Sequence, residues 1–322
     1  QLQGMSLEDL NSANQALHQS LEKAGAGVEL AIANSLWTRE GIAFKPEFLQ
    51  TNQQYYEAEV KTLDFNSPAT LGQINTWVSE NTKGKIQKIV DRINPDDILF
   101  LINAIYFKGN WTNKFDPEQT QTKPFFLDEE IPEQSSPTEA SSVSVEMMSQ
   151  SGEYRYAETE QFQAVSLPYG EEGNLSMYIF LPRSESNLQE FSQQLTAENW
   201  QLWMQQFGNR EGNIEIPRFK LEYEVSLNEA LKVLGMETLF DPAEANFSKM
   251  TEASVAVNEV KHKTFVEVNE EGTEAAAVTS IGVRVTSVPP PPFQMTVDRP
   301  FFFAIRDDRT GTVLFMGSMV EP

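Results

Sequence analysis

The stretch Val266–Phe293, VEVNEEGTEAAAVTSIGVRVTSVPPPPF, combines features of a strand and of a loop. It begins with apolar, β-branched residues alternating with polar ones, which is typical of a strand. Two acids and a glycine, Glu270, Glu271 and Gly272, interrupt that pattern. Small and apolar residues then continue up to four prolines at 289–292, although exposed connections are normally polar. We therefore interpret the stretch as a segment with two conformations, an exposed loop and a strand.

Side-chain alternation favours the strand, because successive side chains of a strand point to opposite faces. One face would carry only uncharged residues, which grow larger toward its end: Thr273, Ala275, Ala277, Thr279, Ile281, Val283 and Val285. The opposite face would carry both charged residues, Glu274 and Arg284. A slip by one residue would bury both charges, so one register is strongly preferred. An Ala-rich helix or a flexible linker is the alternative interpretation of the composition.

Three motifs in this chain resemble the serpin family. The residues EEGTEAAA at 270–277 match the hinge of the reactive-centre loop in inhibitory members, and DRPFFFAIRD at 298–307 matches the strand after that loop. The residues NAIYFKGNW at 103–111 match the family pattern N-A-x-Y-F-K-G-x-W. By this resemblance the hinge comprises Glu271, Gly272, Thr273, Glu274, Ala275, Ala276 and Ala277. The resemblance covers nearly the whole chain.

The resemblance implies an α+β fold with a large central, mostly antiparallel sheet, further sheets and surrounding helices. Residues 1–322 would form a single domain, with the reactive-centre loop at 266–293. Asn103 would lie near the middle of the main sheet, where its strands part, and Trp111 at the top, where the loop enters. His262 matches the family's sheet-gate histidine. The family's opening helices have no counterpart, so we expect an N-terminally incomplete fold from a longer protein, or else a rebuilt gate.

Hydrophobic periodicity and capping residues predict the individual elements. Helices are expected at Ser6–Lys23, Lys45–Ala58, within Ser67–Val90, at Leu188–Phe207 and at Ser226–Gly235. Strands are expected at Val28–Trp37, Val60–Phe65, Ile98–Phe107, Val143–Met148, Gln163–Tyr169, Leu175–Leu181, Ile214–Tyr223 and Val313–Val320. The apolar run at 98–107 is typical of a strand covered on both faces, and Pro217 suggests an edge or a bulge in its strand. The residues 129–144 are expected to form an exposed loop.

The function implied by the resemblance is inhibition of a serine protease by a suicide-substrate mechanism, in which the cleaved loop inserts into the main sheet. The family's spacing from Glu270 places the scissile carbonyl at Thr286, with Ser287 on the leaving side. Val285–Thr286 and Arg284–Val285 remain alternative reactive bonds. Thr or Val at the cut suggests an elastase- or subtilisin-like target, whereas Arg284 suggests a trypsin-like one. A non-inhibitory binding or storage protein and an inactive truncated serpin are the rival interpretations.

Composition excludes several other classes. The net charge of −23 argues against nucleic acids and anionic membrane surfaces as partners. The absence of cysteine excludes disulfides and thiolate metal sites. His18 and His262 are the two histidines, and no G-x-S-x-G or phosphate-binding motif occurs. We therefore expect no enzyme activity, no cofactor, no metal site and a monomeric chain.

The helix expected at Ser6–Lys23 resembles helix D of the serpins, which carries basic residues in heparin-activated members. Here it carries Glu8, Asp9 and Glu22 against Lys23. The sequence therefore predicts no activation by heparin. The family favours an extracellular or periplasmic location, with a cytoplasmic one as the alternative.

Overall fold

The computed structural model describes residues 4–23, 25–127, 141–257, 259–272 and 291–322. The chain divides into two compact units, each described separately below. Unit 1 consists of Gln1–Lys23, Glu29–Phe107 and Leu221–Val266, and unit 2 of Ala24–Val28, Lys108–Lys220 and Glu267–Pro322. Among the described residues, no helix has the length and apolar character needed to cross a membrane.

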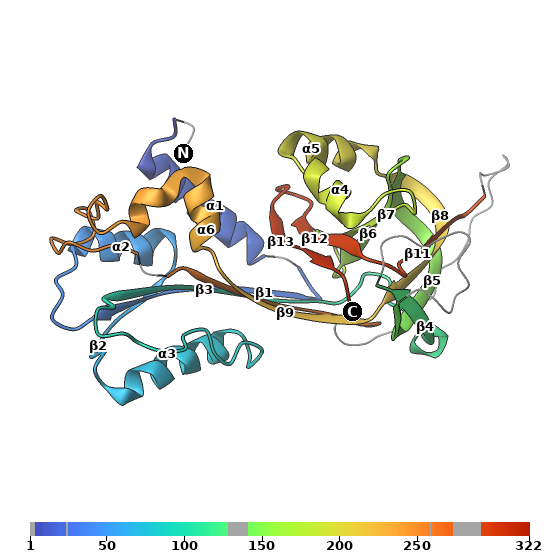
Figure 1. Ribbon diagram of the computed structural model, residues 1–322. Helices are drawn as coiled ribbons and strands as arrows, with labels where there is room; N and C mark the ends of the chain where they lie inside the picture. The colour runs from blue at the N-terminus through green and yellow to red at the C-terminus, as the bar shows by residue number, and fades with distance from the viewer. Residues whose placement is uncertain (1–3, 24, 128–140, 258, 273–290) are drawn as a thin grey trace. The chain divides into compact units, whose positions relative to one another are not determined.

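Unit 1 combines helices with two groups of strands (Figure 1). Its helices are α1 (Leu7–Leu21), α2 (Pro46–Tyr55), α3 (Pro68–Asn81) and the short α6 (Asn228–Leu231). Its strands are β1 (Val28–Arg39), β2 (Glu59–Leu63), β3 (Leu99–Gly109), β9 (Phe219–Ser226) and β10 (Lys261–Val268), of which β1, β3, β9 and β10 continue into unit 2 at one end. These elements confirm the helices predicted before residue 90 and the first three predicted strands, with ends shifted by a few residues.

Capping explains where α1 begins. The side chain of Ser6 accepts a hydrogen bond from the Asp9 backbone nitrogen at 3.1 Å, which satisfies one of the free N–H groups of the first turn. Glu8 and Asp9 place negative charge at the positive end of the helix dipole. At the other end, the Glu22 N–H donates to the His18 carbonyl, so both residues lie on one helical face.

The strands of unit 1 form two separate hydrogen-bonded sheets. One has the order β2-β1-β3, with β1 and β2 parallel, and the other pairs β10 with β9. In the described chain, no ladder of hydrogen bonds joins β3 to β10. Lys263 of β10 bridges Glu222 and Glu224 of β9 at 2.9 and 3.4 Å. Burial alone would lower the pKa of Lys263, but these two carboxylates outweigh burial and raise it.

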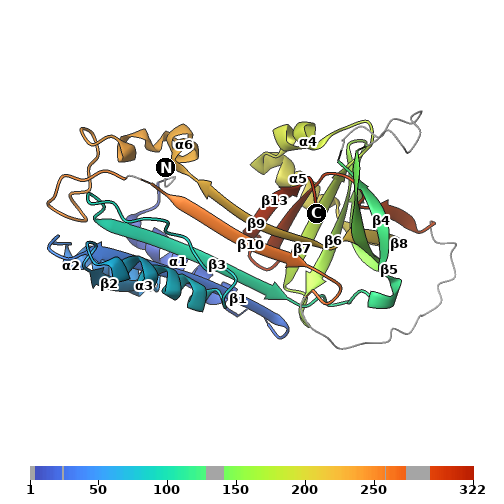
Figure 2. The ribbon, with the colours of Figure 1, turned by 60° about the horizontal axis from the view of Figure 1, so that its bottom comes forward.

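An apolar core is shared by both groups of strands. Figures 1 and 2 show α3 along one face of the strands of unit 1. Ile74, Trp77 and Val78 of α3 belong to a buried cluster that contains Ile102 and Ala104 of β3 together with Phe265 of β10. Because β3 and β10 contribute to one cluster, packing holds them in one layer without a ladder between them.

The opposite face of β3 departs from the prediction. The side chain of Leu101 is 63% exposed, and Asn103 is also exposed. The prediction that this apolar run is covered on both faces is therefore wrong for the described residues, because only the Ile102 and Ala104 side faces a packed core.

Unit 2 is organised around an eight-stranded sheet. Its order is β11-β8-β5-β6-β7-β12-β13, with β4 also pairing with β5. The strands are β4 (Gln121–Phe126), β5 (Ser142–Glu158), β6 (Phe162–Tyr169), β7 (Leu175–Pro182), β8 (Gly208–Pro217), β11 (Phe293–Thr296), β12 (Phe301–Asp307) and β13 (Val313–Met319). The helices α4 (Leu188–Gln194) and α5 (Ala197–Gln206) belong to this unit (Figure 2). Of the pairs whose register is known, only β11–β8 is parallel.

Aromatic rings fill the core between these helices and the sheet. Phe162 and Phe180 of the sheet contact Trp203 of α5 at ring-centroid distances of 5.2 and 5.9 Å. Phe191 of α4 stacks on Trp203 at 5.1 Å. Such aromatic pairs contribute about 0.5–1.5 kcal/mol each beyond the area they bury, so this cluster fixes the helices on the sheet.

Three predicted elements are corrected in detail. The helix predicted at Leu188–Phe207 is two helices, because Thr196 caps a new one through the Asn199 backbone nitrogen. The strand predicted at Ile214–Tyr223 is also two: β8 ends at Pro217 and β9 begins at Phe219, consistent with proline lacking a ladder donor. The helix predicted at Ser226–Gly235 begins as α6 and changes to a wider π-type turn, inside which Gly235 has a φ of 87°.

Candidate functional site

The segment Asn269–Gly272, called here the hinge segment, follows β10 directly and is tied to Trp111. The Trp111 indole N–H donates to the Asn269 carbonyl at 2.8 Å, and its backbone N–H donates to the Glu271 carbonyl at 3.1 Å. The Asn269 side chain accepts from the Glu271 N–H at 3.1 Å. Trp111 is 3% exposed and stacks on Tyr169 at 4.2 Å. A rigid, buried aromatic therefore holds the hinge segment by its backbone.

Gly272 is required at the end of this segment for two reasons. Its φ is +71°, in the left-handed region that residues with a Cβ adopt at a cost. A Cβ there would also overlap the Trp111 nitrogen and the Gly109 carbonyl oxygen, and it would lie 2.7 Å from the Asn110 carbonyl carbon. Glycine thus allows the chain to turn while pressed against the end of β3.

Glu270 anchors the same segment through a buried charge. Its side chain is 5% exposed, and the Arg218 Nε donates to both carboxylate oxygens at 2.8 Å, while the Thr120 hydroxyl donates to one of them. Burial by itself would raise the pKa of Glu270, but these hydrogen bonds outweigh burial and lower it. The same pairing raises the pKa of Arg218. Glu270 is therefore ionised, and its carboxylate binds the side chains of Thr120 and Arg218, which lie next to β4 and β8 in the chain.

A second anchor lies at Phe293, where the chain enters β11. The Phe293 ring stacks on Tyr156 at 3.8 Å, and β11 pairs in parallel with β8. Gly212 lies under the ring, where any Cβ would overlap it. Burial raises the pKa of Tyr156 to about 12, so this ring stays neutral even in moderately alkaline solution. The hinge segment and Phe293, which flank residues 273–290, are thus both fixed by contacts within unit 2.

The edges of β3 and β10 in unit 1 are a second candidate site. Each is a terminal strand of its own sheet, and no ladder joins the two strands within the described residues. Asn103 on β3 donates to the Asn34 side chain on β1 at 2.8 Å. His262 lies half-buried on β10. An edge of this kind can accept an additional strand.

The predicted site residues fall into two groups. Glu271, Gly272, Asn103, Trp111 and His262 lie in the described part of the chain, and the structure brings Trp111 together with Glu271 and Gly272. The remaining hinge residues Thr273, Glu274, Ala275, Ala276 and Ala277, and the reactive-bond residues Arg284, Val285, Thr286 and Ser287, lie outside the described residues. Their roles stay predictions.

Sequence reasoning missed three contributors to the hinge: Thr120, Arg218 and Asn269. The first two come from segments far from the hinge in sequence, so no local pattern announces them. Asn269 directly precedes the two glutamates, and asparagine is enriched in turns because its side chain bonds backbone N–H groups two residues on. The presence of Asn269 could therefore have predicted a turn directly after β10.

Comparison with known proteins places these features in context. A family model described as Serpin (serine protease inhibitor) matches residues 1–322. Human leukocyte elastase inhibitor is 37% identical over 330 residues, covering 98% of this chain and 84% of that protein. Human serpin B11 is 36% identical over 302 residues, covering 91% of this chain and 74% of that protein.

Solved structures agree with the sequence comparison. The crystal structure of tengpin, a thermophilic serpin, in its native state has a TM-score of 0.84 and 30% identity, covering 99% of this chain and 80% of that one. The α+β serpin fold is thereby confirmed. Rabbit heparin cofactor 2 is also similar, at 33% identity over 307 residues, so the prediction of no activation by heparin stays open.

Proposed function

Since the chain belongs to the serpin family of serine protease inhibitors, we propose that it inhibits a serine protease as a suicide substrate. The protease serine attacks the loop between the two anchors and forms an acyl-enzyme. Cleavage frees the segment that begins at Thr273. This segment then inserts as a strand between β3 and β10 and traps the acyl-enzyme before it is hydrolysed.

The observation that carries the proposal is the pair of unjoined strand edges that share one core. Ile102 of β3 and Phe265 of β10 lie in the same apolar cluster, yet the two strands belong to separate sheets. We call the position between the edges of β3 and β10 the slot. Within the described residues, opening this slot breaks no ladder of hydrogen bonds between the two strands. An inserted strand would gain backbone partners on both sides, as in other cases of strand addition.

The hinge segment suits the start of insertion. β10 leads through Asn269 directly to Gly272, so the segment that follows continues from one strand bordering the slot. The backbone clamp by Trp111 and the Glu270–Arg218 pair fix where the chain reverses. The next residue, Thr273, would enter first.

The edge of β3 is long enough to pair with most of the segment. At about 3.3 Å per residue, the segment from Thr273 to a cut at Thr286 extends over ~45 Å, and β3 is 11 residues long, or roughly 36 Å. Ladder hydrogen bonds at about 1 kcal/mol each would contribute on the order of 10 kcal/mol. Ordering the loop offsets part of this gain, and the uncleaved form is then maintained kinetically.

The roles of the hinge residues follow from the alternation of their side chains. In the inserted strand, Thr273, Ala275 and Ala277 would face inward and would add little volume to the sheet. Glu274 would face outward with Ala276, so its charge would stay in solvent. Asn103 and His262 border the slot from β3 and β10, and we assign them to its opening.

The target is proposed to be an elastase- or subtilisin-like protease that cleaves at Thr286–Ser287. The apolar or small residues at Val285 and Thr286 support this choice, as does similarity to a protein named as a leukocyte elastase inhibitor. Cleavage after Arg284 would instead indicate a trypsin-like target.

The test is to mix the chain with elastase, subtilisin and trypsin separately and to analyse the products by denaturing gel electrophoresis and mass spectrometry. A complex that survives detergent and contains protease plus a loop-cleaved chain supports the proposal, and the released peptide identifies the cut. Quantitative loop cleavage with full protease activity would instead make this a non-inhibitory member of the fold.

A further inference from the structure

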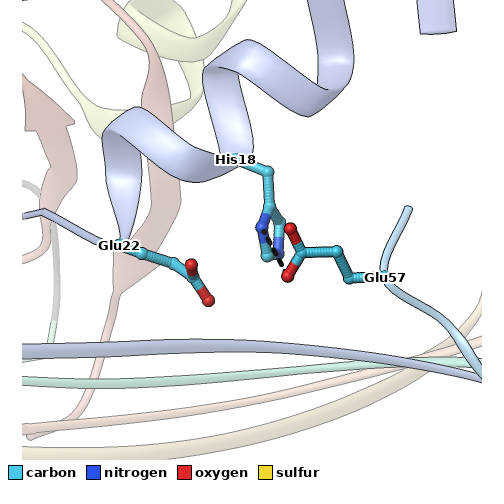
Figure 3. Close-up of side chains that lie close together, drawn as sticks. All are labelled: His18, Glu22 and Glu57. Atoms are coloured by element: carbon cyan, nitrogen blue, oxygen red, sulfur yellow. Dashed lines mark ion pairs between the residues drawn. The ribbon is translucent and has the colours of Figure 1, made fainter. Parts of the chain in front are cut away.

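A cluster in unit 1 that has no part in the inhibitory mechanism brings together His18, Glu22 and Glu57 (Figure 3). His18 and Glu22 lie one turn apart at the end of α1, while Glu57 follows α2. One ligand atom from each side chain, a ring nitrogen and two carboxylate oxygens, lies within 4.8 Å of the others. Figure 3 shows the two carboxylates on either side of the imidazole ring.

The imidazole of His18 is buried, and in the described chain only one of its two ring nitrogens has a hydrogen-bond partner. Its side chain is 8% exposed, and Nε2 lies 3.3 Å from the carbonyl oxygen of Ile32 on β1. Because a carbonyl only accepts, Nε2 carries the hydrogen, and Nδ1 is left with its lone pair in the neutral ring. Nδ1 is buried and, in the described chain, has no hydrogen-bond partner. A buried nitrogen of this kind is costly unless something binds it.

The contact between Glu57 and His18 has the length of an ion pair or of two ligands on one cation, not of a hydrogen bond. Glu57 Oε2 lies 3.7 Å from His18 Nδ1, too far for a hydrogen bond. Two ligands on a tetrahedral zinc ion with bonds of about 2.0–2.2 Å are roughly 3.4 Å apart. The Glu57 side chain is 43% exposed, and Glu22 is also exposed, so an ion can enter from solvent.

The surrounding hydrogen bonds fix Glu57 in place. The Asn34 amide donates to the Tyr56 carbonyl at 2.7 Å, and the Ala58 N–H donates to the Asn52 carbonyl at 3.1 Å. Between these, Glu57 adopts a φ of +51°, which is uncommon for a residue with a long side chain. A turn held in this conformation keeps the carboxylate directed toward α1.

We propose that His18 Nδ1, Glu22 and Glu57 bind a first-row divalent cation, zinc by preference, with solvent completing the coordination. Imidazole nitrogens and carboxylate oxygens both bind zinc, and three protein ligands with water in the fourth position make an open zinc site. The bond from Nε2 to the Ile32 carbonyl provides the outer support that orients metal-binding histidines. The ion would join α1 to the turn before β2. Sequence spacing predicts no such site, because Glu57 reaches His18 only through folding.

The test uses the tag-free chain titrated with Zn²⁺ by calorimetry, with Mg²⁺ as a second ion, and Co²⁺ as a spectroscopic probe. The variants are His18→Gln and Glu57→Gln. Glu47→Gln is the control, since it removes the same charge from an exposed position on α2. We expect one Zn²⁺ per chain in the unmodified protein and in the control. Glu57→Gln should lose about tenfold or more in affinity, because a ligand is gone.

Melting temperatures and the absorption of bound Co²⁺ test the same site independently of the affinity. Zn²⁺ should raise the melting temperature of the unmodified chain and of Glu47→Gln, but not that of Glu57→Gln. Bound Co²⁺ should give the visible absorption of a four- or five-coordinate site, which is absent in Glu57→Gln. If His18→Gln fails to fold, Glu57→Gln still tests the site, because a substitution at the half-exposed Glu57 leaves the chain folded. Equal Zn²⁺ affinity in Glu57→Gln and Glu47→Gln, or no binding to the unmodified chain, would overturn the proposal.

Discussion

A Cβ atom placed on Gly272 would overlap the backbone nitrogen of Trp111. That nitrogen already donates to the Glu271 carbonyl, so it cannot move away without releasing the hinge segment. The backbone at the end of β3 and the backbone of the hinge segment therefore fit closely against each other. A glycine here is required by space as well as by its φ of +71°.

Gly272→Ala should destabilise the native chain by roughly 3 kcal/mol, from the left-handed conformation and from overlap together. The matched control is Gly41→Ala. Gly41 has a φ of +87°, but nothing lies within 4 Å of the position that its Cβ would take, so only the conformational cost of about 1 kcal/mol applies. Denaturant midpoints measure both. Equal losses would show that the Trp111 contact does not constrain the hinge.

Arg218→Gln should cost about 1–3 kcal/mol, because it leaves the buried Glu270 carboxylate without its main partner. Arg218 is 42% exposed, which keeps the loss below that of a fully buried pair. Lys45→Gln is the control: its partner Glu252 is 84% exposed, so the loss should be within about 0.5 kcal/mol. Thermal melting at neutral pH compares the two variants. Similar losses of stability would contradict a stabilising role of the Glu270–Arg218 pair.

The Glu270 pair also predicts a pH dependence. The folded pKa of Glu270 is lowered below its ordinary value of 4.5, so the unfolded chain binds more protons in acid. The contribution of Glu270 is then fully present above pH 4.5 and is lost as the pH falls through the folded pKa. Arg218→Gln should flatten the decline in stability over that acidic range. An unchanged slope in the variant would assign acid sensitivity to other carboxylates, such as Asp307.

Local sequence patterns predicted where helices and strands occur better than they predicted what packs against these elements. The Ser6 cap and the leucine spacing were sufficient for α1, and the apolar run ending at Phe107 was sufficient for β3. Whether Leu101 is covered depends on what packs above β3, which no pattern within the strand records. The break at Thr196 could have been predicted, because threonine followed by a helical turn is a capping signal.

The candidate site shows the same division. The EEG sequence and the NAIYFKGNW motif singled out Glu271, Gly272 and Trp111, which the structure brings together, while the role of the residues after Gly272 stays a prediction. The clamp on Glu270 depends on Thr120 and Arg218, which are brought together only when β4 and β8 take their places beside β5. His18 and Glu57 are joined in the same way. Contacts between distant segments are set by tertiary packing, so a single sequence does not reveal them.

Heparin should leave the rate of protease inhibition unchanged within about twofold, because α1 presents acidic rather than basic side chains and polyanions are repelled by like charge. Glu8, Asp9 and Glu22 are exposed on or beside this helix. The second-order rate constant, measured with and without heparin at low ionic strength, tests this. An acceleration that disappears in high salt would mean that a basic surface elsewhere on the chain binds heparin.

Cleavage of the reactive loop should raise the melting temperature. If insertion adds about 10 kcal/mol to a chain of this size, the transition should shift upward by roughly 20 °C or more. The loop is nicked with a protease that the chain does not trap, and intact and nicked samples are melted at the same scan rate. An unchanged transition would remove the support for a metastable intact form.

Thr273→Arg should convert the chain from an inhibitor into a substrate, because a long charged side chain on the inward face blocks the first step of insertion. Glu274→Arg is the control, since the neighbouring position would face outward in the inserted strand and would tolerate charge. Both variants should be cleaved at the same bond by the target protease. Only Glu274→Arg should form the detergent-resistant complex, and the ratio of cleaved chain to complex measures the difference. Because the two variants differ in face but not in the residue introduced, equal trapping by both would reject insertion in this register.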